Sequence, residues 1–230
     1  MLQVRIDAKN FGDAAILRDV SLALAPGSFT VLTGRSGCGK TTLLRILAGL
    51  DRDWRGTISG EARIGYVFQD PRLLPWRSVL DNVRLAADES VTPPKMSLDA
   101  IAMVGLEESA SAYPGALSMG MARRVAIARA IAVGPQVLIM DEPFVSLDEG
   151  TAGQLRALTL RLWQKHRWTV LMVTHNLSEA AQMADRVVVL GGRPARIAGE
   201  IALERPREKR DAPWLEQTAA RLRGIVECEP

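Results

Sequence analysis

The segment "SFTVLTGRSGCGKTTLLRILAGL" constrains the fold more than any other part of this 230-residue chain. Its apolar run predicts a buried strand over Phe29–Thr33, which leads through a glycine-rich turn directly into a helix. The helix is expected to turn four leucines inward: Leu43, Leu44, Leu47 and Leu50. The segment therefore predicts one strand–loop–helix unit.

The turn in this segment has the spacing of a phosphate-binding loop, with Gly34, four residues, and then Gly39, Lys40 and Thr41. The glycines let backbone N–H groups close around a phosphate that side chains would exclude. Lys40 is expected to reach the β- and γ-phosphates of a nucleotide, and the Thr41 hydroxyl to bind Mg²⁺. The candidate nucleotide-binding residues are Gly34, Arg35, Ser36, Gly37, Cys38, Gly39, Lys40, Thr41 and Thr42. Cys38 is expected to fill a loop position, the alternative being a redox role.

The segment "QVLIMDEP" predicts a second buried strand, Val137–Met140, which ends in two carboxylates. Because ligands bind at the carboxyl ends of parallel strands, both acids are expected at the ligand edge. Asp141 would hold Mg²⁺ or its water shell, and Glu142 would accept hydrogen bonds from the water that attacks the γ-phosphate. The alternative is a strand that ends in two solvated acids.

Two further apolar strands end in polar residues. "WTVLMVTH" ends at His175, which can donate a hydrogen bond to the γ-phosphate, although such a histidine can also be structural. "IGYVF" precedes Gln69, which can reach Mg²⁺ or the attacking water, the alternative being an exposed loop residue. We expect both side chains to contribute to the nucleotide site.

The segment "ALSMGMARRVAIARA" predicts a helix with Ser118 as its N-cap. A capping box would place Glu or Gln three residues later, but that position holds Met121, so the N–H groups at the tip remain available to an anion. The alternative is an amphipathic helix whose arginines simply face water. The apolar positions are Met121, Val125, Ala128 and Ala132, while Arg123, Arg124 and Arg129 fall mostly elsewhere.

Composition sets outer limits on function. The chain is 47% hydrophobic and 24% charged, which is typical of a globular protein. No apolar run approaches the ~18 residues of a membrane span, and the N-terminus has no signal-peptide core, so we expect a cytosolic chain. A net charge of +3 is too slight to indicate a nucleic-acid partner. Two cysteines (Cys38 and Cys228) and two histidines (His166 and His175) show no ligand spacing, so no structural metal is expected.

Taken in order, these motifs resemble the ATP-binding subunits of ABC transporters, over about Val4 to Leu203. The matching pieces are "GRSGCGKTT", "FQD", "LSMGM", "VLIMDEP", "SLD" and "THN". Many enzymes contain phosphate loops, but the helix that begins with "LSMGM" is specific to this family and its DNA-repair relatives. The family pattern Leu-Ser-Gly-Gly usually has a glycine where this chain has Met119.

The resemblance implies a head-to-tail dimer in which two copies of the chain enclose two ATP molecules. Ser118 and Gly120 of one copy would then complete the phosphate loop of the other, and Asp148 would cross the same interface. Phe11 stands where the family places an aromatic residue that stacks on adenine, the alternative being a core residue.

The implied fold class is α/β: a P-loop NTPase (RecA-like) core of mainly parallel sheet, with N-terminal antiparallel strands and an inserted helical subdomain. The resemblance makes residues 1–230 a single ABC ATPase domain, with the subdomain at about 86–135. Residues from about 204 to 230 balance six acidic with six basic side chains and are expected to form a solvated helical extension. "DESVTPPKMS" is expected to form turns, and "VVVLGGRPARI" a hairpin.

Two segments resemble a narrower group, the ATPases of nitrate, sulfonate, taurine and thiamine-precursor importers: "FQDPRLLPWRSVLDNV" and "LGGRPARIAGEIALERPRE". The resemblance implies a peripheral ATP hydrolase at the cytoplasmic face of the inner membrane. Its partners would be an integral membrane permease and, through it, a soluble substrate-binding protein. We expect the permease to dock near Gln69–Trp76 through Leu73, Leu74 and Trp76, unless these side chains pack inside the helical subdomain.

Three other functions remain open. An ATP-driven exporter is the nearest alternative. A DNA-associated ATPase of the repair type would usually carry a long coiled-coil insertion, and the inserted lobe shows no sustained heptads. A phosphate-loop kinase would need an acceptor pocket rather than the "LSMGM" helix.

Overall fold

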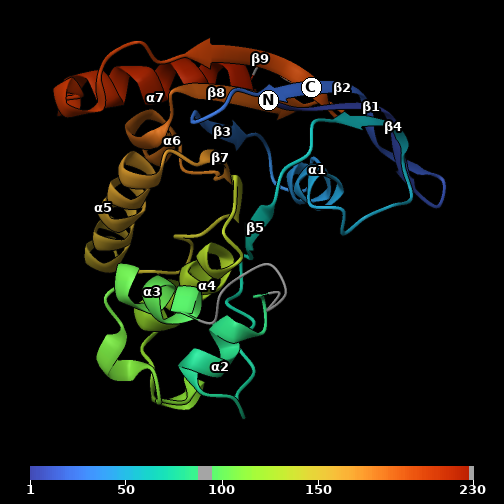
Figure 1. Cartoon of the computed structure of the whole chain (residues 1–230). Helices are drawn as coiled ribbons and strands as arrows, with labels where there is room; N and C mark the ends of the chain where they lie inside the picture. Colours follow the sequence, from blue (N-terminus) through green and yellow to red (C-terminus); the bar gives the residue numbers. More distant parts are fainter. Residues whose placement is uncertain (88–94, 228–230) are drawn as a thin grey trace. The chain divides into compact units, whose positions relative to one another are not determined.

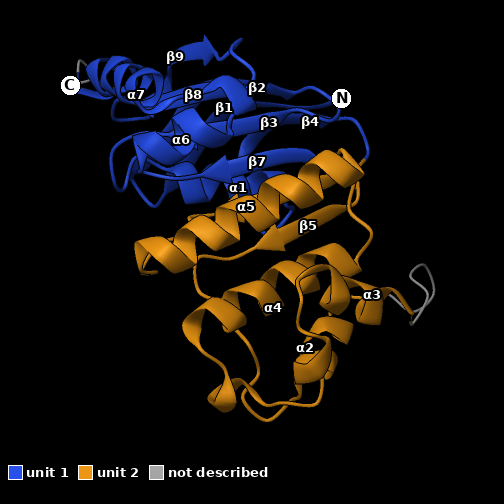
Figure 2. Ribbon diagram, turned by 90° about the vertical axis from the view of Figure 1, so that its left-hand side faces the viewer, with its two compact units in different colours: residues 1–61, 169–230 blue, residues 62–168 orange. Residues whose placement is uncertain are grey.

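The computed structural model describes residues 1–87 and 95–227 and divides the chain into two compact units (Figure 2). Unit 1 combines Met1–Glu61 with Thr169–Pro230, and unit 2 is Ala62–Trp168. Each unit contains part of the predicted ligand edge.

Unit 1 begins with a three-stranded antiparallel sheet in the order β2-β1-β4 (Figure 1). The strands are β1 (Leu2–Phe11), β2 (Ala14–Leu24) and β4 (Arg55–Ser59). Buried and less buried residues alternate along the start of β1, because successive side chains of a strand point to opposite faces. The predicted N-terminal antiparallel strands are confirmed.

A second set of strands in unit 1 has the order β7-β3-β8-β9. Strands β7 (Thr169–Val173), β3 (Phe29–Thr33) and β8 (Arg186–Gly191) are parallel, whereas β9 (Arg196–Ala202) pairs antiparallel with β8. Every residue of β3 and β7 is buried, as expected for parallel strands covered on both faces. The predicted strand Phe29–Thr33 and the predicted late hairpin are both confirmed.

The helices of unit 1 are α1 (Lys40–Leu47), α6 (Leu177–Met183) and α7 (Ala212–Glu227), with a short 3₁₀ turn η3 (Arg207–Lys209). Helix α1 buries three of the four leucines expected inside, but Leu50 is 57% exposed. That prediction was wrong because the helix ends at Leu47 and Gly49 turns the chain with φ +69°.

Helix α7 lies in the range where a solvated extension is expected. It packs against α6, β8 and β9 (Figure 1) and buries Ala219 and Leu222, so one of its faces is part of the unit 1 core. The expected helix is confirmed by α7, but the expectation that this extension is solvated was wrong for its buried face. Residues 228–230, which include Cys228, lie outside the described residues.

Unit 2 contains the parallel pair β5 (Ile64–Val67) and β6 (Val137–Asp141) and four helices (Figure 2). The helices are α2 (Val79–Arg84), α3 (Lys95–Met103), α4 (Met119–Ala132) and α5 (Glu149–His166), with 3₁₀ turns η1 (Glu107–Ser109) and η2 (Pro114–Ala116). Most of the expected turn "DESVTPPKMS" lies outside the described residues, and its last three residues begin α3 instead of forming a turn.

Helix α4 contacts α2, α3, α5 and β5, so little of its circumference is left to solvent. Val125, Ala128 and Ala132 are buried as predicted. Arg123 was expected to lie off the buried face, but it is only 3% exposed. The apolar period describes one face of the helix, whereas neighbouring elements cover several.

The predicted fold class, an α/β P-loop NTPase with a mainly parallel sheet and antiparallel N-terminal strands, is confirmed. The subdomain limits near 86, 135 and 204 remain predictions. No helix in the described ranges is both long and apolar enough to cross a bilayer.

Candidate functional site

The phosphate loop connects β3 to α1 and depends on glycine at two positions. Gly34 has φ +149° and Gly39 has φ +105°. A Cβ atom on Gly34 would lie 2.1 Å from the Leu190 carbonyl oxygen, and one on Gly39 would lie 2.9 Å from Leu17 Cδ2. The loop therefore packs so closely on its surroundings that its backbone, rather than side chains, forms the surface offered to a ligand.

Lys40 ties the loop to the start of α1. Its side chain is buried, and Nζ donates hydrogen bonds to the Gly34 and Arg35 carbonyl oxygens, each at 2.8 Å. An ammonium group has three donors, so one N–H remains for a phosphate oxygen. No side chain caps the helix at Gly39, and its first turn contains no acidic residue. The positive end of the helix dipole is thus offered to an anion together with Lys40, and these residues fit a bound phosphate.

The other loop residues surround this cationic centre. Arg35, Ser36 and Gly37 are exposed, and Thr41 and Thr42 lie half-buried in the first turn of α1. Cys38 is buried, with Sγ 3.6 Å from the Leu190 carbonyl oxygen, which agrees with its expected role as a loop-filling residue.

His175 reaches the same sheet edge as the phosphate loop. Strand β7 runs parallel to β3 with Val173 opposite Leu32, and the Thr174 amide donates to the Leu32 carbonyl at 3.3 Å. Both strands therefore end at one edge, with His175 exposed two residues beyond β7. The phosphate loop and His175 thus follow the same edge of the unit 1 strands, and the role of His175 at the nucleotide stays a prediction.

Phe11 ends β1 and is 53% exposed. The Lys9 Nζ atom lies 4.5 Å from the centroid of the Phe11 ring, a cation–π contact. This exposure contradicts the alternative of a core residue and leaves the ring accessible to a planar ligand.

The acidic pair lies at the carboxyl end of β6 in unit 2. Val67 of β5 pairs with Met140 of β6. Asp141 is the last residue of β6, and Gln69 and Glu142 follow the ends of these two parallel strands. The Tyr66 hydroxyl donates to Asp141 Oδ2 at 3.4 Å, and Asp141 is only 4% exposed. The three unit 2 residues predicted from strand ends thus lie at the carboxyl ends of two paired strands, and their joint role stays a prediction.

The donor set suits Mg²⁺ bound jointly with phosphates. Carboxylate, amide and hydroxyl oxygens are appropriate ligands, and Mg²⁺ commonly takes only one or two carboxylates when it also binds nucleotide phosphates. Within residues 1–87 and 95–227, no three acidic, His or Cys side chains form a cluster for an all-protein cage. Asp141 and Gln69 of unit 2 and, separately, Thr41 of unit 1 have the donor atoms expected of Mg²⁺ ligands.

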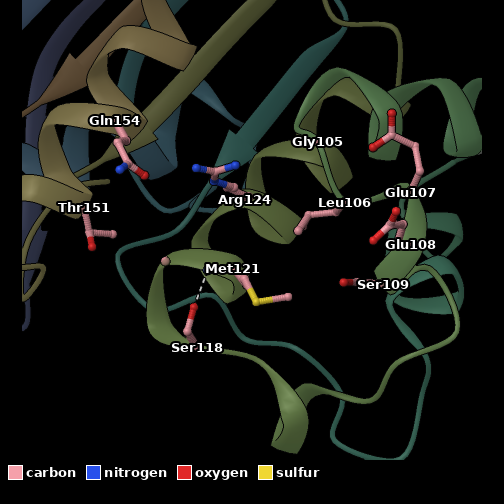
Figure 3. A pocket seen from close by; sticks show the side chains of 11 residues that line it. Gly105, Leu106, Glu107, Glu108, Ser109, Ser118, Met121, Arg124, Thr151 and Gln154 are labelled. Atoms are coloured by element: carbon pink, nitrogen blue, oxygen red, sulfur yellow. Dashed lines mark hydrogen bonds between the residues drawn. The ribbon is translucent and has the colours of Figure 1, made fainter.

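Ser118 caps α4 as predicted: its Oγ accepts a hydrogen bond from the Met121 amide at 3.2 Å. The first turn contains no acidic residue. Beside this tip is a cavity of about 730 Å³ (Figure 3). Its lining comes from the tip, from α4 and α5, and from the turn around η1: Ser118, Gly120, Met121, Arg124, Thr151, Gln154, Gly105, Leu106, Glu107, Glu108 and Ser109.

Asp148 has a local role that the sequence interpretation missed. Its Oδ1 accepts a hydrogen bond from the Thr151 amide at 2.9 Å and caps α5. Hydrogen bonds from Thr151, first from its side chain and then from its backbone, lower the pKa of the Asp148 carboxyl. The signal was available, because Asp followed by a helical segment is a common N-cap. Thr151 and Gln154, which line the cavity, were also missed.

The candidate residues fall into two groups. Phe11, the phosphate loop and His175 belong to unit 1. The other group belongs to unit 2 and comprises Gln69, Ser118, Gly120, Asp141, Glu142 and Asp148.

Comparison with known proteins places this arrangement in a family. The model of the family described as "ABC transporter" matches residues 17–145. The aliphatic sulfonates import ATP-binding protein SsuB 1 of Xanthomonas axonopodis pv. citri is 45% identical, over 90% of this chain and 88% of its own length. The SsuB protein of Granulibacter bethesdensis is 47% identical, over 89% of this chain and 85% of its own length.

A solved structure agrees with these relatives. The dimeric post-hydrolysis state of an ATP-binding cassette bound to ADP and phosphate superposes with a TM-score of 0.75. It is 28% identical, and the match covers 90% of this chain and all of the solved one. The chain therefore belongs to the ABC transporter family.

Proposed function

We propose that this chain is the ATP-hydrolysing subunit of an importer for a small sulfonate-like solute. The observation that carries the ATPase role is the phosphate loop, where buried Lys40 and the uncapped start of α1 offer positive charge at one point. The solute class is supported by the relatives named as aliphatic sulfonates importers. Nitrate and taurine are the related solutes to compare with sulfonates.

Each candidate residue has a definite chemical part in this proposal. Lys40 and the loop N–H groups bind the β- and γ-phosphates, and His175 donates a hydrogen bond to the γ-phosphate. Thr41, Gln69 and Asp141 hold Mg²⁺, which neutralises phosphate charge when it is bound. Gln69 also reaches the attacking water. Glu142 accepts hydrogen bonds from this water and takes its proton, so that a hydroxide-like oxygen bonds to the γ-phosphorus while the bond from this phosphorus to the β,γ-bridging oxygen breaks and ADP leaves.

We propose that two copies bind head to tail and share their ATP molecules. Ser118 and Gly120 of one copy would face the nucleotide held by the loop of the other, with Asp148 at the same interface and Phe11 stacked on adenine. Three observations support this arrangement: the tip of α4 carries no acidic side chain in its first turn, Phe11 is exposed, and the matched cassette is a dimer.

The proposed permease surface is the segment Gln69–Trp76. Trp76 is 70% exposed, while Leu73 and Leu74 are half-buried, so one large apolar side chain is free to contact a partner. Arg129 donates to the Pro71 and Arg72 carbonyl oxygens at 2.6 and 3.0 Å, which anchors this segment to α4. Binding here would place the subunit at the cytoplasmic face of the inner membrane, with a soluble substrate-binding protein acting through the permease.

A DNA-associated ATPase is a weaker alternative. In the described part of unit 2, helices α2, α3 and α4 contain 6, 9 and 14 residues. None of these lengths provides the several heptads that a coiled-coil arm requires. We therefore propose no nucleic-acid partner.

The proposal can be tested by reconstituting this subunit, its permease and its binding protein in vesicles and measuring ATP hydrolysis and solute transport. Adding an aliphatic sulfonate to the binding-protein side should raise ATP hydrolysis several-fold and should carry the sulfonate to the side where ATP is present. A system with Lys40→Ala should do neither. Stimulation by nitrate or taurine alone would reassign the solute, and transport away from the ATP side would show an exporter.

A further inference from the structure

Arg123 in α4 is a buried cation whose hydrogen bonding is incomplete. Its side chain is only 3% exposed, and Nη2 donates to the Val145 carbonyl oxygen at 3.1 Å. Nε and Nη1 have no acceptor in the described ranges. Burying a guanidinium with a single acceptor is costly, since desolvated donors normally require partners. A methionine could fill similar space without that cost. Filling space therefore does not account for an arginine here, and the feature that distinguishes Arg123 is its bond to Val145.

The Val145 carbonyl belongs to a turn that carries backbone strain on both sides. Glu142 has φ +45° and Ser146 has φ +63°, both in the left-handed region that favours glycine. Between them, the Val145 amide donates to the Glu142 carbonyl at 3.3 Å. Strained backbone persists only where surrounding contacts hold it, and Arg123 supplies a contact at the centre of this turn.

The charge around Arg123 links it to a second segment of unit 2. Burial lowers the pKa of the guanidinium, and the Asp70 carboxylate opposes that shift. Asp70 follows Gln69 directly, and in the part of the chain that the structure describes the Arg123 side chain donates its hydrogen bond to the Val145 carbonyl oxygen. Arg123 is therefore held by its hydrogen bond to the Val145 carbonyl oxygen.

We propose that Arg123 is a positioning residue for ATP hydrolysis. By holding the Val145 carbonyl, Arg123 fixes the Glu142–Ser146 turn. A shift of α4, the helix that Ser118 caps, would therefore move the Glu142 carboxylate. The inference rests on the proposed role of Glu142 as the base. The tip of α4 is proposed to act on the ATP of the partner copy. Arg123 would connect the same helix to ATP hydrolysis within its own chain.

Two substitutions separate this role from simple packing. Arg123→Met fills space without a donor, whereas Arg123→Lys keeps a charged N–H donor on a chain almost as long. We expect Arg123→Met to lower kcat at least tenfold while the KM for ATP changes less than twofold, and Arg123→Lys to recover kcat to within about threefold of wild type. Arg161→Met, on an exposed position of α5, is the matched control and should leave both constants unchanged.

Separate measurements distinguish loss of folding, failure of the Arg123 role and failure of the proposed role of Glu142. A thermal melt of each variant reports folding, and kcat is expressed per folded protein. Wild-type kcat in Arg123→Met, or equal loss in Arg123→Met and Arg123→Lys, would overturn the positioning role. In single-turnover measurements, adding Arg123→Met to Glu142→Gln should cause no further loss, because both changes act on one group. If Glu142→Gln itself hydrolyses ATP at the wild-type rate, the base assignment fails instead.

Discussion

Gly120 and Thr151 approach so closely that a Cβ atom at position 120 would lie 2.7 Å from Thr151 Cγ2. Both residues line the cavity beside the Ser118 end of α4, and Figure 3 labels Thr151. The one glycine of the "LSMGM" motif, Gly120, is thus required by packing against α5 as well as by any ligand at the tip.

We therefore predict that Gly120→Asp nearly abolishes ATP hydrolysis, because it adds both a clash and a carboxylate where the partner copy's γ-phosphate would bind. Gly120→Ala should cause a smaller loss, and Thr151→Ser, which removes the Cγ2 methyl group, should restore part of it. Steady-state ATPase measurements on the single and double variants test this relationship. Substantial activity in Gly120→Asp would contradict the proposed position of the tip.

Met119 departs from the family pattern, and we predict from its position in the structure that it is tolerated. It is the first residue of α4, has no positive φ, and is 55% exposed. Methionine is a good helix former, so no left-handed strain arises. Met119→Gly should change ATPase activity by less than about tenfold, a barrier change below roughly 1.4 kcal/mol. A large gain would instead reveal an impaired tip that depends on a more competent partner.

Lys40→Ala should abolish productive ATP binding. The substitution removes the N–H donor aimed at phosphate and also the two hydrogen bonds that hold the Gly34 and Arg35 carbonyls. Binding of a fluorescent ATP analogue measures the effect, and Lys165→Ala, an exposed position near the end of α5, provides the control. Equal affinity in Lys40→Ala and wild type would remove the loop from the nucleotide site.

Much of the fold and of the candidate site could be predicted from sequence, because the sequence patterns that indicate them are local. The glycine spacing, the apolar runs that end at Asp141 and His175, and the Ser118 cap each depend on residues within one segment. Arg123 could not be predicted in this way, because its burial depends on how many neighbours cover α4. The prediction that Leu50 is buried was wrong for a related reason. The helical period continues in the sequence, but the backbone turns at Gly49.

Trp76→Ala should weaken co-purification with the permease and leave the isolated subunit folded. The side chain is 70% exposed, so its removal deletes little of the unit 2 core. The thermal melt should change by less than a few degrees. An unfolded variant would mean that Trp76 belongs to the packing of the helical subdomain, and unchanged co-purification would move the docking surface elsewhere.

In the proposed mechanism, Glu142 activates water at an ATP molecule held between two copies of this chain. Glu142→Gln keeps the shape and polarity of the side chain but removes the base. The direct measurement combines ATP hydrolysis with light scattering on the purified variant, with Lys40→Ala as the binding-deficient control. We predict that Glu142→Gln binds ATP, accumulates as a dimer and loses nearly all hydrolysis, whereas Lys40→Ala stays monomeric. Hydrolysis at the wild-type rate by Glu142→Gln would contradict the account.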